Sequence, residues 1–102
     1  MFKLKTKNSQ LKTQVLKIII VSWNVRNLLR GCLQSLTQDL TGLESRIILV
    51  DSASSDGTPA MVRAEFPHVE LIAREENIGY VKGNNLALKR LETARKGSTR
   101  FA

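Results

Sequence analysis

The sequence predicts an α/β protein of three layers, α/β/α, in which helices cover both faces of a parallel sheet. Strand-sized apolar segments alternate with amphipathic segments of helical period along residues 17–91. Such alternation favours parallel strands joined by right-handed crossovers. Polar loops rich in Ser, Asn, Asp and Gly follow the predicted strands. Ligands of open α/β sheets bind beyond the carboxyl ends of the strands, so these loops are the candidate site.

The first strand is predicted over residues 17–22, a continuous β-branched run typical of a strand covered on both faces. The helix that follows is predicted to begin near Asn27, a residue type that can cap a helix. It ends before Gly42, which breaks the pattern. Its apolar face has the spacing i, i+1, i+4, i+5 and i+8 and consists of Leu28, Leu29, Cys32, Leu33 and Leu36.

The second strand is predicted over residues 46–50, and the small polar residues 52–57 form a loop after it. Thr58 is a plausible N-cap for the second helix, because Pro59 suits the first helical position. Pro67 ends this helix, since proline cannot continue a helix from its interior.

The third strand is shorter and covers residues 69–73, where apolar residues alternate with Glu70. Residues 75–80 form a turn in which Gly79 is free to adopt unusual backbone dihedrals. The last helix is predicted over residues 83–91.

Composition indicates one domain for a chain of 102 residues. Residues 1–16 are Lys-rich without a clear period and are interpreted as a disordered basic tail before a domain over residues 17–102. The net charge of +7 resides at the two ends of the chain, which argues against a nucleic-acid-binding face on the folded core. No apolar run reaches the roughly 20 residues that span a bilayer, and no secretory signal is visible. We therefore expect a cytoplasmic protein, whose tail is either solvated or attracted to anionic lipid at the inner face of the cell membrane.

The loop after the second strand carries the strongest chemical signal. Asp51 follows four apolar strand residues directly, and its carboxylate can accept hydrogen bonds from a base ring N–H or a ribose hydroxyl. Trp23, after the first strand, can offer its ring face to a flat base. Ser52, Ser54 and Ser55 add hydroxyls, and their small size lets a ligand come close. Asp56 before Gly57 has two interpretations that both stay open, a ligand contact and an Asx turn that starts the next helix.

The loop of residues 77–85 suits a phosphate group. It combines Gly79, Gly83 and Lys82 with the start of a helix, whose free N–H groups favour anions. It is neither a P-loop nor a dinucleotide fingerprint. A glycine-containing turn with Asn caps explains the loop equally well when it is considered alone.

Together the three loops resemble the opening of family 2 glycosyltransferases, with most likeness to the rhamnosyltransferase-like branch that builds bacterial cell-surface polysaccharide. The resemblance covers residues 17–91 and rests on residues 18–24, 50–57 and 76–87. It implies the N-terminal, nucleotide-binding half of a GT-A fold, with a Rossmann-like sheet. It also implies inverting transfer of a sugar from a UDP- or TDP-linked donor to a hydroxyl of a glycan or lipid-linked acceptor.

The resemblance implies roles for individual positions. Residues 22–24 would lie against the base and ribose, and Asp51 would bind one of these groups. Ser52 stands where the family usually has Asn or Asp. Residues 83–84 would approach the diphosphate, with Lys82 as a nearby cation where many relatives have Arg. The expected nucleotide-sugar-binding residues are Ser22, Trp23, Asn24, Asp51, Ser52, Asp56, Gly79, Lys82, Gly83 and Asn84.

One departure from the family concerns catalysis. Family 2 enzymes continue with an Asp-x-Asp motif that holds a divalent metal, Mg²⁺ or Mn²⁺, and later with a carboxylate base. No Asp or Glu follows Glu92 here, so we expect the chain to stop before that motif and its residues to bind no metal. Residues 1–102 alone should lack transferase activity, because the charge on the leaving diphosphate would not be neutralised.

Two other functions were weighed. The first is a non-catalytic nucleotide-binding or regulatory α/β module, which would share the same loops. The second is a receiver-like signalling domain phosphorylated on Asp51. It fits poorly, because such domains cluster acids at the end of the first strand, and that end here has the sequence Ser22-Trp23-Asn24.

Overall fold

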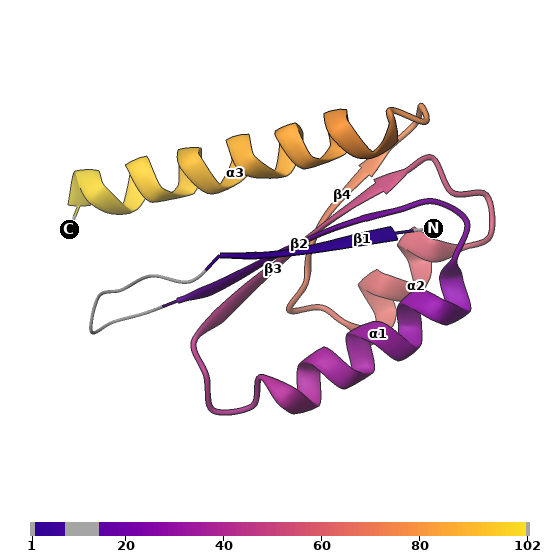
Figure 1. Ribbon diagram of the computed structural model, residues 1–102, viewed down its shortest axis with the longest axis horizontal. Helices are drawn as coiled ribbons and strands as arrows, with labels where there is room; N and C mark the ends of the chain where they lie inside the picture. The colour runs from indigo at the N-terminus through magenta and orange to yellow at the C-terminus, as the bar shows by residue number, and fades with distance from the viewer. Residues whose placement is uncertain (1, 8–14, 102) are drawn as a thin grey trace.

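The computed structural model describes residues 2–7 and 15–101, and the side chains of residues 15–92. A twisted sheet forms the middle layer, with α1 and α2 on one face and α3 on the other (Figure 1). The three-layer α/β/α prediction is therefore confirmed. In chain order the elements are β1 (Phe2–Lys7), β2 (Leu16–Ser22), α1 (Arg26–Asp39), β3 (Ser45–Ser52), α2 (Thr58–Glu65), β4 (Glu70–Arg74) and α3 (Gly79–Phe101).

The sheet has the order β1-β2-β3-β4, and β2, β3 and β4 are parallel as predicted. The register places Ser22 opposite Asp51, and Asp51 opposite Ala73. The carboxyl ends of the three parallel strands therefore lie side by side at one edge of the sheet. The loops that the sequence analysis selected start from this edge.

Strand β1 is a correction to the sequence analysis. It pairs antiparallel with β2, from Phe2 opposite Ser22 to Lys7 opposite Lys17. The interpretation of residues 1–16 as a disordered tail is therefore wrong for residues 2–7 and for Leu16, which begins β2, while residue 1 and residues 8–14 lie outside the described residues. The physical reason is the open edge of β2, whose backbone N–H and C=O groups need partners. The alternation of apolar residues with lysines in this segment has the period of a strand.

Two hydrophobic cores explain why β2 and β3 have continuous apolar sequences. Successive strand residues point to opposite faces, and both faces of these two strands are covered. The core under α1 and α2 includes Ile18, Ile20, Leu29, Leu33, Ile47, Leu49, Met61, Val62, Phe66 and Val69. The core under α3 includes Ile19, Val21, Ile48, Val50 and Ala87.

Helix α1 begins one residue before the predicted cap. Its N-cap residue is Val25, which makes no side-chain cap, so the prediction of Asn27 as the cap is wrong. The N–H of Arg26 instead donates to Asp56 Oδ2 at 2.9 Å. The Asp56 carboxylate, from the β3–α2 loop, thus caps α1 in place of an N-cap side chain. The spacing of residues along α1 cannot reveal a cap that comes from another part of the chain.

The other two helices also begin earlier than predicted. The N-cap of α2 is Gly57 in a left-handed conformation (φ 86°), so Thr58 is the first helical residue rather than the cap. Helix α3 begins at Gly79 instead of residue 83. Among the residues that the structure describes, no helix combines the length and the apolar character needed to cross a membrane.

Candidate functional site

Asp51 organises the end of β3 and ties it to β2. The residue is fully buried. Its Oδ1 accepts hydrogen bonds from the hydroxyls of Ser22, at 3.0 Å, and Ser54, at 2.5 Å, and its Oδ2 accepts one from the Ser54 N–H at 2.9 Å. Ala53, which lies between Asp51 and Ser54 in the chain, has φ 64°, and this conformation lets Ser54 turn back onto the Asp51 carboxylate. The buried carboxylate thus accepts three hydrogen bonds, one from the end of β2 and two from the β3–α2 loop.

A second set of hydrogen bonds joins the β2–α1 and β3–α2 loops. The N–H of Asn24 donates to Ser54 Oγ, and the N–H of Ser55 donates to Asn24 Oδ1, both at 2.8 Å. Asn24 has φ 50°, a conformation that Asn tolerates better than most residues. The hydroxyl of Ser54 therefore links the backbone of one loop to the Asp51 carboxylate of the other.

Asp56 is held by the starts of both α1 and α2. Its Oδ2 accepts the Arg26 N–H, and its Oδ1 accepts the N–H and the hydroxyl of Thr58, at 3.2 and 2.5 Å. Burial by itself would raise the pKa of Asp56, but hydrogen bonds from Thr58 and Arg26 lower this pKa below its ordinary value. These contacts favour the Asx-turn interpretation of Asp56. Its role as a ligand contact stays a prediction.

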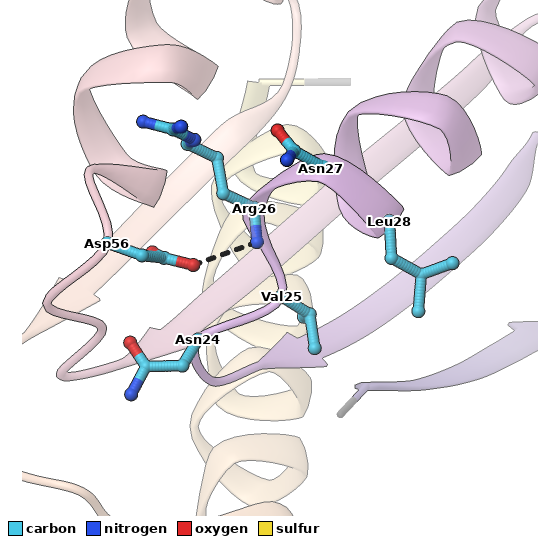
Figure 2. Close-up of a pocket in the computed structure, with 6 residues that line it drawn as sticks. All are labelled: Asn24, Val25, Arg26, Asn27, Leu28 and Asp56. Carbon is cyan, nitrogen blue, oxygen red and sulfur yellow. Dashed lines mark hydrogen bonds between the residues drawn. The ribbon is translucent and has the colours of Figure 1, made fainter.

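A pocket of about 300 Å³ lies where α1 begins, next to these loops (Figure 2). Figure 2 shows the Asp56 carboxylate directed at the Arg26 backbone and the Asn24 side chain at the loop before α1. Trp23 precedes this segment and is 46% exposed. The pocket is lined by Asn24, Val25, Arg26, Asn27, Leu28 and Asp56.

Ser52 points to the other face of the sheet and contacts the β4–α3 loop. Its hydroxyl donates to Asn77 Oδ1 at 2.8 Å and accepts from the N–H groups of Ile78, at 2.7 Å, and Gly79, at 3.2 Å. Asn77 Oδ1 also accepts the Gly79 N–H at 3.1 Å. The start of α3 is thereby joined to the residue that follows Asp51.

The first turns of α3 lie close to the sheet. Gly83 packs so tightly that an added Cβ would lie 2.9 Å from Val21 Cγ1. Asn84 is only 6% exposed, and its Nδ2 donates to the Tyr80 carbonyl at 2.9 Å. No hydrogen-bond partner from the described part of the chain reaches its Oδ1. Lys82 lies on the exposed side of the same turn.

Side-chain hydrogen bonds bring four of the ten predicted site residues together in two pairs. Ser22 bonds Asp51, and Ser52 bonds Gly79. Ser54 was expected as a small hydroxyl near the ligand, whereas its hydroxyl bonds the Asp51 carboxylate and the Asn24 N–H. Asn77 had no predicted role of its own, although an Asn two residues before a glycine is a signal of a turn. Of the predicted set, Ser22, Asp51, Ser52, Gly83 and Asn84 are buried, Asp56 is half-buried, and Trp23, Asn24, Gly79 and Lys82 are exposed.

The described residues do not fit a divalent metal centre or a cysteine nucleophile. They contain no group of three or more His, Cys, Asp or Glu side chains that could hold a metal ion. The two strand-end carboxylates, Asp51 and Asp56, are already occupied by hydrogen bonds from the protein. Burial raises the pKa of the Cys32 thiol, which keeps it protonated and unreactive.

The model of the family described as glycosyl transferase family 2 matches residues 17–93. The chain belongs to this family. The match runs from the start of β2 into α3 and so includes all three strand-end loops. No curated protein and no solved structure gave a significant match to the chain. Membership confirms the resemblance deduced from the loops and makes this a glycosyltransferase segment of the nucleotide-sugar-binding kind, while the rhamnosyltransferase-like subtype stays a prediction.

Proposed function

We propose that residues 17–93 bind the donor of an inverting glycosyltransferase, which moves a sugar from a UDP- or TDP-linked donor to the hydroxyl of a glycan or lipid-linked acceptor. The observation that carries this proposal is the joining of three strand-end loops by side-chain hydrogen bonds. Ser22 and Asp51 connect β2 with β3, and Ser52 connects β3 with the start of α3. The site thus has two halves, on the two faces of one sheet.

The half around Asp51 suits the base and ribose. The pocket at the start of α1 lies beside it, and the exposed ring of Trp23 is adjacent in the chain. A base needs an aromatic face and acceptors for its ring N–H, and a ribose needs acceptors for its hydroxyls. Asp51 itself is fully buried, so in this half it would hold Ser22 and Ser54 in place beside the pocket, and its direct contact with the base or ribose stays a prediction.

The half around α3 suits the diphosphate. Gly83 brings the helix backbone against β2, and the first-turn N–H groups of a helix attract anions. Lys82, exposed on this turn, supplies a positive charge. The Oδ1 of Asn84 has no hydrogen-bond partner among the described residues, and a hydroxyl group of the nucleotide sugar would donate a hydrogen bond to it.

In this proposal the chain binds and orients the donor but does not perform the transfer. The acceptor hydroxyl would displace the diphosphate at the anomeric carbon in line, which inverts its configuration. Among the described residues no group of three or more His, Cys, Asp or Glu side chains could hold a metal ion, so the Mg²⁺ or Mn²⁺ and the carboxylate base expected of the family have no assigned residues in this proposal. Synthesis of cell-surface polysaccharide on the cytoplasmic side of the membrane, with peripheral attachment at its inner face, completes the proposal.

Calorimetric titration with UDP and TDP tests donor binding. Trp23→Ala is the main variant because this side chain is partly exposed, so the fold should tolerate the change. Loss of one base-stacking contact, worth about 1–3 kcal/mol, should weaken binding of both nucleotides. Tyr80→Ala, which removes an aromatic side chain of similar exposure at the start of α3, is the matched control and should change the affinity less. Absence of binding by the unaltered protein would reject the proposal.

Burial of Asp51 disfavours the receiver-like alternative. A phosphoryl acceptor must be reached by the phosphoryl donor, whereas this carboxylate is fully buried under three hydrogen bonds. The non-catalytic nucleotide-binding module would have the same binding site as our proposal. A sugar-transfer assay separates the two, because only a glycosyltransferase site would transfer the sugar when a metal site and a base are supplied to it, whereas we expect residues 1–102 alone to transfer none.

A further inference from the structure

We propose that Ser52 is a positioning residue, which fixes the start of α3 relative to Asp51 without contacting the ligand. This inference rests on the proposed function, because it assigns Ser52 a task between the two halves of the donor site. It replaces the expectation that the Ser52 side chain itself binds the nucleotide sugar.

The hydrogen bonds of Ser52 leave its hydroxyl no capacity for a ligand. A hydroxyl offers one donor and two acceptor positions. The single donor is used on Asn77 Oδ1, and the two acceptor positions are used by the N–H groups of Ile78 and Gly79. Ser52 is also fully buried. A ligand could bind this hydroxyl only by displacing one of these bonds.

The partners of Ser52 identify what the hydroxyl does. The first N–H groups of a helix lack partners within the helix and are usually satisfied by an N-cap side chain. Here Gly79 begins α3 with φ 77°, and its N–H is shared between Asn77 Oδ1 and Ser52 Oγ. Ser52 therefore acts as a second cap, supplied by a strand. Ile78, beside it, packs against the core under α3.

Ser52 directly follows Asp51, so this cap and the Asp51 hydrogen bonds come from neighbouring residues of β3. Consecutive strand residues point to opposite faces of a sheet. Asp51 bonds Ser22 and Ser54 on the α1 side, and Ser52 bonds the start of α3 on the other side. One dipeptide at the end of β3 thus sets the distance between the base end and the diphosphate end of the donor site.

The test compares Ser52→Ala with Ser35→Ala in the full chain. Ser35 is an exposed serine of α1 that belongs to none of the strand-end loops. Amide hydrogen exchange of Ile78 and Gly79 is measured by NMR, and the affinities for UDP and uridine by calorimetry. Uridine lacks the diphosphate, so it reports on the base and ribose half alone.

We expect Ser52→Ala to speed exchange at both amides about tenfold and to weaken UDP binding about tenfold, as the loss of one well-formed hydrogen bond would. Uridine affinity should stay unchanged, and Ser35→Ala should alter none of these quantities. An equal loss of uridine and UDP affinity would show direct contact with the nucleoside and overturn the inference. Unchanged exchange at Ile78 and Gly79 would overturn it as well.

Two further measurements keep the inference separate from the proposed function and from folding. If the unaltered chain binds neither UDP nor uridine, the donor-site proposal fails, while the exchange rates still decide whether Ser52 holds the start of α3. If Ser52→Ala does not fold, Ser52→Cys replaces it, because a thiol is close to the hydroxyl in size but is a weak acceptor for the N–H groups of Ile78 and Gly79. Faster exchange at these two amides with unchanged uridine affinity is then the expected result, and unchanged exchange contradicts the inference.

Discussion

The β3–α2 loop and the β4–α3 loop leave the same edge of the sheet but are held differently. The first depends on two acids, Asp51 at the end of β3 and Asp56 in the loop, which accept hydrogen bonds from the loop itself, from the end of β2 and from the starts of α1 and α2. The second is held mainly by the hydroxyl of Ser52, on β3, and by the packing of Ile78, with one hydrogen bond of its own from the Gly79 N–H to Asn77 Oδ1.

This difference shows that a carboxylate at a strand end is not by itself a free ligand contact. The acids that mark the β3–α2 loop in the sequence stabilise the loop first, and a ligand finds at most a remaining lone pair. The β4–α3 loop uses fewer side chains and leaves unused polar capacity on the helix after it, at Asn84 Oδ1. The predictions below test the two loops in turn.

Removal of the Asp51 carboxylate should have the largest effect. Asp51→Ala leaves the hydroxyl of Ser22 and the N–H and hydroxyl of Ser54 without their acceptor in a buried site. Hydrogen bonds to charged groups contribute about 1.5–3 kcal/mol each net, and shared ones add less than their sum. We expect the free energy of unfolding to fall by about 3 kcal/mol, measured by urea denaturation. Asp39→Ala, at an exposed aspartate, should change it by less than about 0.5 kcal/mol.

A methyl group at position 83 should have the next largest effect, in the β4–α3 half. In Gly83→Ala the new Cβ would lie 2.9 and 3.0 Å from the two γ-methyls of Val21, and overpacking of this kind costs about 1–3 kcal/mol. Gly31→Ala is the matched control, because nothing lies within 4 Å of its added Cβ and it lies in α1. That change should raise stability by about 0.5–1 kcal/mol through helix propensity.

A double-mutant cycle identifies the cause of this loss. Val21→Ala removes the two γ-methyls that the new Cβ would meet. The combined variant should therefore be more stable than the sum of the two single changes predicts, by about 0.5 kcal/mol or more. Additive effects of the two substitutions would mean that α3 moves away from β2 instead of pressing on Val21.

The sequence predicted the parallel strands and the layers well, because their apolar periodicity directly reflects burial on two faces. It predicted the three loops as one site for a similar reason, since parallel strands align their carboxyl ends. It missed the starts of α1 and α3, because both depend on caps from other elements, Asp56 for α1 and Ser52 for α3. Such caps lie about 25–30 residues away along the chain and leave no local pattern.

Strand β1 was missed for another reason. Six residues with three lysines have the composition of a solvated tail, and their alternation became meaningful only because β2 offers an unpaired edge. The roles of Ser52 and Asp56 were also open in the sequence, since residue type cannot show whether a hydroxyl or carboxylate is already satisfied. Only the donor and acceptor positions in the structure decide that.

The last prediction concerns Asp56 and depends on pH. Asp56→Ala removes the acceptor for the Arg26 N–H and for the Thr58 N–H and hydroxyl. At neutral pH the loss should resemble that of an N-cap, about 1 kcal/mol. The pKa of Asp56 is lowered by these hydrogen bonds, so the ionised carboxylate stabilises the folded chain above the ordinary aspartate pKa of about 3.9.

The sign of this linkage fixes the pH range in which the effect must disappear. Because the folded state holds Asp56 ionised to lower pH than the unfolded state does, its contribution is lost as the pH falls through the lowered pKa. The difference in unfolding free energy between the unaltered chain and Asp56→Ala should stay constant from pH 7 to about 5 and shrink below about 4. Urea denaturation at intervals of pH measures it, with Asp39→Ala as the exposed control. A difference that persists undiminished well below pH 3.9 would mean that the carboxylic acid caps α1 and α2 as well as the carboxylate does, and that the β3–α2 loop is held by shape rather than by charge.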